Sequence, residues 1–225
     1  MPIARSTVAG AVTGVVLLAG AVGFGVGLPK VSEEPTITSA DLPKLPDRLD
    51  SRMQALSTVT VEDAGVTAPA DKAAVPGFAE RAGKGDTIAA SHLATLYGAA
   101  RVRSYIDAKA MGQAATTQTA PAQIAVSIVP GEAGLVIPNG PFEIQQSGAN
   151  YQLSEIGGHR CAISWQQAVD PSTGMPATGT KVPASNYQAE CRAERGGLAY
   201  DVFSTGLEPK ELATYLDVVL ERTAS

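Results

Sequence analysis

The feature that most constrains this chain is an uncharged apolar run close to its start. The run covers residues 7–28, a length of 22 residues, and Arg5 lies just before it. A helix rises about 1.5 Å per residue, so the run reaches roughly 33 Å and can cross a hydrocarbon core about 30 Å thick. We therefore expect a single-pass anchor over residues 7–28, with residues 1–6 in the cytoplasm and the rest of the chain outside it.

A cleavable export signal is the alternative for this segment. Residues 8–18 would be its apolar part and Ala19-Gly20-Ala21 its cleavage site, and the protein would then be secreted. Residues 22–28 stay apolar after that site, which favours the uncleaved anchor.

Small residues within the run have the spacing that lets two membrane helices approach closely. A dimer through these positions is a further expectation, and they are Gly10, Gly14, Gly23 and Gly27.

The charge balance argues against nucleic acid as a partner. The chain has 17 Lys and Arg residues against 22 Asp and Glu residues, a formal net charge of −5. Arg5 and Lys30 flank the apolar run, so the exported part is mildly acidic and has no basic stripe to neutralise phosphates.

The exported part divides into two regions by composition. Residues 29–86 carry scattered Pro, Gly, Thr and charged residues without a period of 3.6 or 2. Such a segment buries too little apolar area to offset its ordering entropy, so we expect a largely disordered stalk. A globular domain would then cover residues 87–225 and begin with a helix over residues 88–98. Residues 101–108 could continue that helix, but we expect a strand.

Alternation of apolar and polar residues follows, with short Gly-containing connections between the alternating segments. This pattern predicts an antiparallel meander, with strands over residues 123–129, 142–146, 151–155, 159–166, 187–194 and 198–204. The last segment changes to a helical period, with apolar residues at Leu212, Tyr215, Leu216, Val219 and Leu220 after Pro209. The predicted fold class is therefore α+β, a β-meander covered by a C-terminal helix.

The chain has two cysteines, Cys161 and Cys191, and an exported pair is expected to form a disulfide. If they lie opposite each other on neighbouring strands, Trp165 faces Tyr187, and apolar partners fall on one side of the sheet.

The turn before Cys161 leaves two choices. A two-residue turn at Gly157-Gly158 would set Ser154 opposite Cys161, which breaks the parity of apolar residues. We therefore expect a three-residue loop over residues 156–158, which sets Leu153 opposite Cys161.

The sequence contains no catalytic or metal-binding signature. His92 and His159 have no ligand-like spacing with Cys, Asp or Glu, and no cofactor is expected. A hydrolase built from His159, Asp201 and a serine would be an arbitrary selection. Four glutamates are interpreted as solvated positions: Glu132, Glu155, Glu190 and Glu194.

A long polar segment, residues 167–186, separates the two strands that carry the cysteines. Loops of this length inside a compact domain are often binding elements. Its candidate binding residues are Asp170, Met175, Lys181 and Asn186, and a hairpin tip without function is the alternative.

In overall style the chain resembles exported proteins of high-GC bacteria that have no characterised activity. The likeness consists of the Ala-, Gly- and Val-rich anchor, the Pro- and Ala-containing stalk, and a small domain with two cysteines before a terminal helix. We therefore expect a membrane-anchored, non-catalytic binding or scaffolding domain whose protein or small-molecule partner is unknown. The alternatives are a small-ligand or lipid carrier with a cavity between sheet and helix, and a hydrolase.

Overall fold

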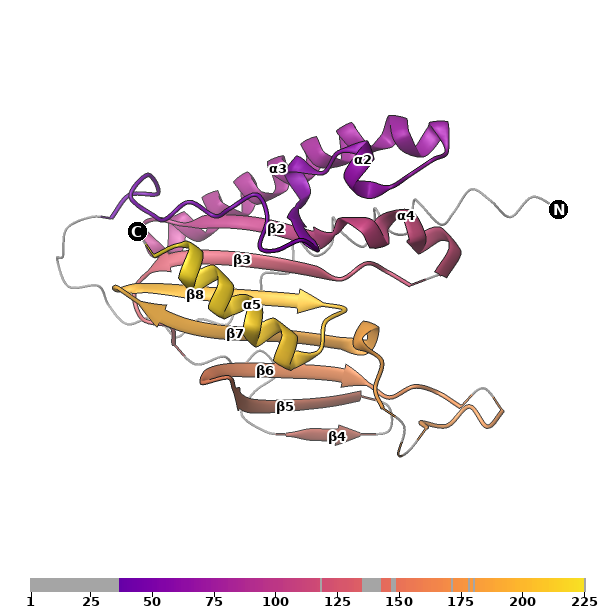
Figure 1. Ribbon diagram of the computed structural model, residues 1–225. Coiled ribbons are helices and arrows are strands. Elements are labelled where there is room, and N and C mark those ends of the chain that lie inside the picture. The colour runs from indigo at the N-terminus through magenta and orange to yellow at the C-terminus, as the bar shows by residue number, and fades with distance from the viewer. Residues whose placement is uncertain are drawn as a thin grey trace.

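The computed structural model describes residues 37–117, 119–134, 143–146, 149–170, 172–177, 179 and 181–224. Within these ranges one antiparallel sheet of eight strands has the order β1-β2-β3-β8-β7-β6-β5-β4 (Figure 1). The strands are β1 (Met53–Ala55), β2 (Arg101–Asp107), β3 (Gln123–Pro130), β4 (Ile144–Gln146), β5 (Ala149–Ile156), β6 (His159–Gln166), β7 (Tyr187–Arg195) and β8 (Leu198–Thr205). The helices are η1 (Leu56–Thr58), α2 (Val61–Ala64), α3 (Pro69–Tyr97), α4 (Ala108–Thr117), η2 (Ala184–Asn186) and α5 (Pro209–Arg222).

The predicted α+β class is confirmed in its antiparallel sheet and its C-terminal helix. Residues 101–107 form a strand, as expected, and β6 has the bounds that the alternation predicted. The strand β1 was not expected, because it lies in the segment assigned to the stalk.

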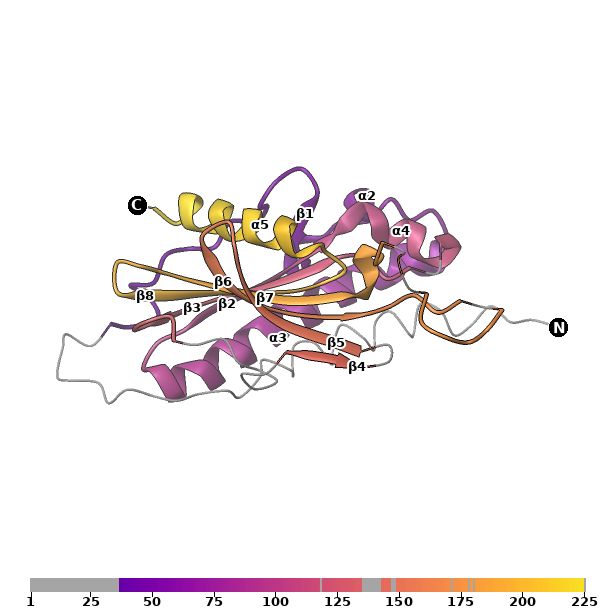
Figure 2. The same ribbon diagram turned by 90° about the horizontal axis from the view of Figure 1, so that it is seen from below.

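Helices cover the two faces of the sheet unequally. Figure 2 shows α5 and α2 on one side of the sheet and α3 on the other. Leu212, Leu216 and Val219 of α5 are fully buried against the sheet, as the helical period predicted. Their core also includes Cys161, Ile163 and Cys191, with Trp165 and Tyr187 partly buried at its border, and side chains from both layers fill this interface.

The expected stalk is wrong for residues 37–86. Leu42, Leu45, Leu49 and Met53 are buried in the core that α5 covers, on the same face of the sheet. The side chains of β2 hold this segment in place, since Arg103 donates to the Leu45 carbonyl at 2.7 Å and Tyr105 to the Pro46 carbonyl at 2.9 Å. The folded part therefore begins well before residue 87.

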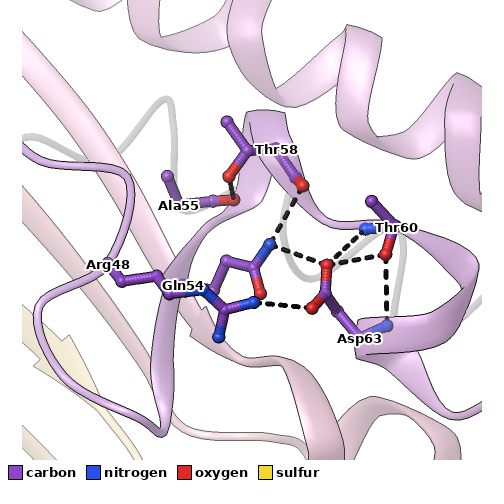
Figure 3. Close-up of polar contacts among 6 residues, drawn as sticks. All are labelled: Arg48, Gln54, Ala55, Thr58, Thr60 and Asp63. Atoms are coloured by element: carbon purple, nitrogen blue, oxygen red, sulfur yellow. Dashed lines mark hydrogen bonds and ion pairs between the residues drawn. The ribbon is translucent and has the colours of Figure 1, made fainter.

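A polar network fixes the turn between β1 and α2 (Figure 3). The carboxylate of Asp63 accepts hydrogen bonds from the N–H and the hydroxyl of Thr60 and from the Gln54 amide, and it forms an ion pair with Arg48. The Thr60 hydroxyl in turn accepts from the Asp63 N–H. This reciprocal arrangement is a capping box. The hydrogen bond from the Thr60 hydroxyl, with those from Gln54, the Thr60 N–H and Arg48, lowers the pKa of Asp63 to about 2, although burial opposes the shift.

The first helix of the expected domain is longer than predicted. Helix α3 begins at Pro69, in the favoured first-turn position, and ends at Gly98, whose φ of +81° suits glycine. Val75 and Phe78 pack with Ile106 of β2 in a second core, and the carboxylate of Asp86 accepts from the Ser104 hydroxyl at 2.6 Å. Tertiary contacts therefore hold a helix whose own apolar stripe is weak.

The register of the central strands is confirmed, and that of β5 is not. Cys161 pairs with Cys191 and Trp165 with Tyr187, as expected. Ser154, not Leu153, lies opposite Cys161, because Gly157 and Gly158 make a two-residue turn with φ of +62° and +81°. Tyr151 and Leu153 thus point to the other face of the sheet, where they form a small apolar cluster with Ala162.

The anchor prediction cannot be compared with the structure, since residues 7–28, with Gly10, Gly14, Gly23 and Gly27, lie outside the described residues. Of the helices in residues 37–224 that the structure describes, none is both long and apolar enough to cross a membrane.

Candidate functional site

The loop between β6 and β7, residues 167–186, is closed tightly at its base. The disulfide between Cys161 and Cys191 joins the two strands, with 4.1 Å between their Cα atoms. Trp165 and Tyr187 stand opposite each other at the ends of these strands, and their ring centroids are 6.4 Å apart. The strands therefore present the loop from a rigid support, and the predicted disulfide is confirmed.

The first half of the loop is a small hairpin held by its own backbone. Val169 and Pro176 form an isolated antiparallel bridge, the Ala177 N–H donates to the Ala168 carbonyl at 2.7 Å, and the Asp170 N–H donates to the Met175 carbonyl at 2.9 Å. Because these backbone hydrogen bonds hold the hairpin in one shape, it presents a defined surface to a partner.

Asp170 organises the tip of this hairpin. Its carboxylate accepts from the hydroxyl of Ser172 at 2.6 Å and from the N–H of the same residue at 2.8 Å. These bonds hold the pKa of Asp170 below its usual value, and the bond from the Ser172 hydroxyl has the largest effect. The Asp170 carbonyl also accepts from the N–H of Gly174 at 2.8 Å, whose φ of +68° favours glycine. Asp170 therefore serves the turn itself.

The second half of the loop packs back on the domain. The Nζ of Lys181 lies 2.5 Å from Oε1 of Glu208, the residue before α5, and this contact raises the pKa of Lys181. The side-chain amide of Asn186 donates to the Gln166 carbonyl at 2.9 Å and so closes the loop at its base. Val182 between them is buried.

Two apolar side chains remain on the surface of the hairpin. Met175 is 62% exposed and Val169 is 59% exposed, and they stand on the two strands of the same turn. Among the large apolar side chains of the described residues, only Ile88 and Leu96 of α3 share this degree of exposure. Of the four candidate residues in this loop, Met175 is thus the one that offers apolar surface.

Val169 was not among the predicted site residues. The signal that could have found it is the sequence around Asp170 and Gly174, since Asp and Gly at this spacing are typical of a turn. Such a turn places the residue before Asp170 and the residue after Gly174 on its two strands, and those are Val169 and Met175.

A polar cluster occupies the sheet face that does not carry the disulfide. Arg192 pairs with Asp201 directly across the β7–β8 ladder, and its guanidinium also lies 2.7 Å from Oε1 of Glu190. The side chain of Glu190 is only 17% exposed, so its interpretation as a solvated position is wrong. Burial, together with the negative charge of Asp201, raises the pKa of Glu190 to about 8, although Arg192 opposes the shift.

The side chains considered for a hydrolase lie on opposite faces. Nε2 of His159 is 2.7 Å from Oδ1 of Asp217 in α5, whereas Asp201 bonds to Arg192 on the other side of the sheet. Within the part of the chain that the structure describes, no group of three or more His, Cys, Asp or Glu side chains is placed to hold a metal ion.

The function must be inferred from the residues of this chain. No known protein family, curated protein or solved structure shows a significant match to it.

Proposed function

We propose that this chain is a membrane-anchored, non-catalytic binding module that holds a protein partner outside the cytoplasm through the loop between β6 and β7. The observation that carries the proposal is the exposure of two large apolar side chains, Val169 and Met175, on a hydrogen-bonded hairpin. Exposed apolar side chains on a hairpin held by its own hydrogen bonds suit a protein interface, because burying them gains free energy without ordering a mobile segment.

The other candidate residues of the loop support a role in presentation rather than in chemistry. Asp170 is bonded within the turn, Lys181 to Glu208 and Asn186 to Gln166. Their polar groups are thus used to hold the loop, which leaves apolar contact as the means of recognition.

Two features support the location. The run over residues 7–28 has the length and composition of a membrane anchor. The disulfide of Cys161 and Cys191 is of the kind that persists in an oxidising compartment, on the outer side of such a membrane.

Photo-crosslinking of the full chain in the membranes of cells that make it tests this function. A photoreactive amino acid in place of Met175 should give one discrete, saturable adduct with a protein. The matched position is Lys210, which is exposed on α5 and should give none. The substitution Val169→Ser should weaken the Met175 adduct, because it removes one of the two exposed apolar side chains.

Adducts of the same size and yield from both positions would contradict a specific site. No adduct from Met175 in a chain that is correctly exported would contradict the binding role of this loop.

A further inference from the structure

The folded residues 37–86 leave a short connection between the apolar run and the domain. Only residues 29–36, eight in number, separate residue 28 from Ile37, the first described residue. Eight residues span at most about 30 Å, the length of a fully extended chain. If residues 7–28 lie in a bilayer, as proposed above, the part of the domain closest to Ile37 lies close to the lipid surface.

The structure identifies that part of the domain. The Ser39 hydroxyl accepts from the Ala100 N–H at 3.2 Å, and the Arg101 guanidinium donates to the Ser39 carbonyl at 2.7 Å. Ala100 and Arg101 lie two and three residues after Gly98, the C-cap of α3. The connection therefore meets the domain beside the C-terminal end of α3.

The C-terminal half of α3 has an uncharged outer surface. Residues 87–100 contain no Asp, Glu, Lys or Arg. Ile88 is 56% exposed and Leu96 is 42% exposed, and the exposed His92 lies between them, so the three are spaced four apart along one stripe of the helix. The helix thus offers apolar side chains beside the point where the connection arrives.

The hydroxyl groups on this surface are bonded within the helix. Thr87 donates to the Gly83 carbonyl at 2.9 Å, Ser91 to the Thr87 carbonyl at 2.9 Å and Thr95 to the His92 carbonyl at 2.6 Å. A hydroxyl that is bonded to its own helix loses less when it leaves water. This surface can therefore enter a less polar environment at low cost.

Leu96, near the end of α3, and the loop of Val169 and Met175 lie at opposite ends of the sheet. The start of β2 pairs with the end of β3, and the end of β3 pairs with the start of β8. The start of β8 pairs with the end of β7, which in turn lies beside the start of β6. Helix α3 ends at the start of β2, whereas the loop of Val169 and Met175 follows the end of β6 (Figure 1). A membrane contact at the C-terminal end of α3 would thus lie at the other end of the sheet from this loop.

We propose that residues 87–97 of α3 lie on the lipid surface that holds the anchor, with Ile88 and Leu96 inserted at the level of the headgroups and upper acyl chains. This inference rests on the proposed anchor and adds the orientation of the domain. The occupant is lipid because the connection is too short to carry this surface far from the bilayer, and because the surface is uncharged over three turns.

Fluorescence quenching by brominated lipids tests the orientation. The full chain carries Trp165→Phe, so that a single new tryptophan reports, and it is reconstituted into nanodiscs of phosphatidylcholine brominated on the acyl chains. Leu96→Trp should lose most of its fluorescence relative to nanodiscs of unbrominated lipid. The matched variant Val169→Trp, an exposed apolar position at the other end of the sheet, should keep its fluorescence.

A second substitution checks that the apolar stripe causes the contact. Ile88→Asp added to the Leu96→Trp chain should reduce the quenching, because it sets a charge against the lipid. Val169→Asp added to the same chain should leave the quenching unchanged.

The outcomes separate the orientation from the anchor. A chain that does not float with liposomes overturns the anchor and with it this inference. A chain that floats while Leu96→Trp is unquenched overturns the orientation alone. An unquenched but blue-shifted Leu96→Trp signal would mean that protein, such as a second copy of this chain, covers the surface, and this also overturns the assignment to lipid.

Discussion

The hydroxyl of Tyr215 in α5 donates a hydrogen bond of 2.8 Å to Oδ2 of Asp50, a residue 165 positions earlier in the chain. Asp50 also accepts from the N–H groups of Arg52 at 2.8 Å and Met53 at 2.7 Å. Burial acts to raise the pKa of this carboxyl, but its hydrogen bonds outweigh burial and hold the pKa below the usual value. The C-terminal helix and the segment before β1 are thus joined by a charge-assisted bond.

Replacing Tyr215 by Phe should lower the free energy of unfolding by about 1 kcal/mol, because it removes this donor and keeps the ring in the core. Denaturant unfolding of the exported domain, residues 29–225, measures the loss. Thr214→Ala on the exposed side of α5 should stay within about 0.5 kcal/mol of the original protein. Equal losses from both variants would show that the bond to Asp50 does not contribute.

Leu49→Ala tests whether the segment before β1 belongs to the core. Leu49 is 1% exposed, so its truncation should leave a cavity and cost about 2 to 5 kcal/mol. Lys44→Ala, at an exposed position in the same segment, should cost less than about 0.5 kcal/mol. A small effect of Leu49→Ala would return this segment to the stalk that its composition predicted.

The sequence predicted those parts of the fold that depend on local pattern. Alternation located β3, β6, β7 and β8, and the opposition of Cys161 and Cys191 set the register between β6 and β7, since a shift by one residue would turn apolar side chains to the wrong face. The terminal helix was equally clear, because its apolar stripe is regular.

The region before β2 could not be predicted because its stability comes from contacts between distant segments. Its glycines were interpreted as linker residues, yet Gly83 permits close packing, as does Gly112 of α4, which packs against the end of α2. A Cβ at Gly83 would lie 3.3 Å from the Cβ of Ser57, and one at Gly112 would lie 2.5 Å from the Ala64 carbonyl oxygen. Composition alone does not distinguish such a glycine from one in a flexible segment.

The length of the candidate loop was enough to locate it in the sequence. Its exposed apolar side chains, Val169 and Met175, could not be identified in the same way. Asp170, Lys181 and Asn186 are polar residues of a polar loop, and only the structure shows that each is used to hold it. The burial of Glu190 was missed for a related reason. Its neighbours are Arg192, two residues later on the same strand, and Asp201 on the adjacent strand, and the sequence alone does not show that these side chains meet.

Loss of the disulfide should destabilise the domain strongly. Cys161 and Cys191 are 30 residues apart, and closing such a loop contributes about 3 to 4 kcal/mol in the chain-entropy model. Replacing both residues by Ala should therefore lower the melting temperature sharply. A reducing agent should lower the melting temperature of the original protein in the same way and leave that of the double variant unchanged. Insensitivity of the original protein to reduction would contradict a stabilising bridge.

The docking of α5 is tested by one buried and one exposed residue of the helix. Leu216 is fully buried under the sheet, so Leu216→Ala should cost about 2 to 5 kcal/mol. Lys210 is exposed, and Lys210→Ala should cost less than about 0.5 kcal/mol. Small and equal effects would mean that α5 does not cover the sheet in solution.

Glu190 should make the domain less stable as the pH rises. Its pKa is about 8 in the folded protein, against about 4.3 for an unperturbed glutamate, so the folded state holds a proton that the unfolded chain releases. The contribution of this group is therefore complete below about pH 4 and is lost as the pH rises through about 8. Melting temperatures measured between about pH 5 and pH 8 should fall less for Glu190→Gln than for the original protein, because the amide cannot ionise. Glu194→Gln, at an exposed position on the same strand, should keep the original dependence on pH. If Glu190→Gln keeps that dependence as well, the carboxyl of Glu190 is already ionised in the folded protein, and Arg192 compensates both of its acidic neighbours.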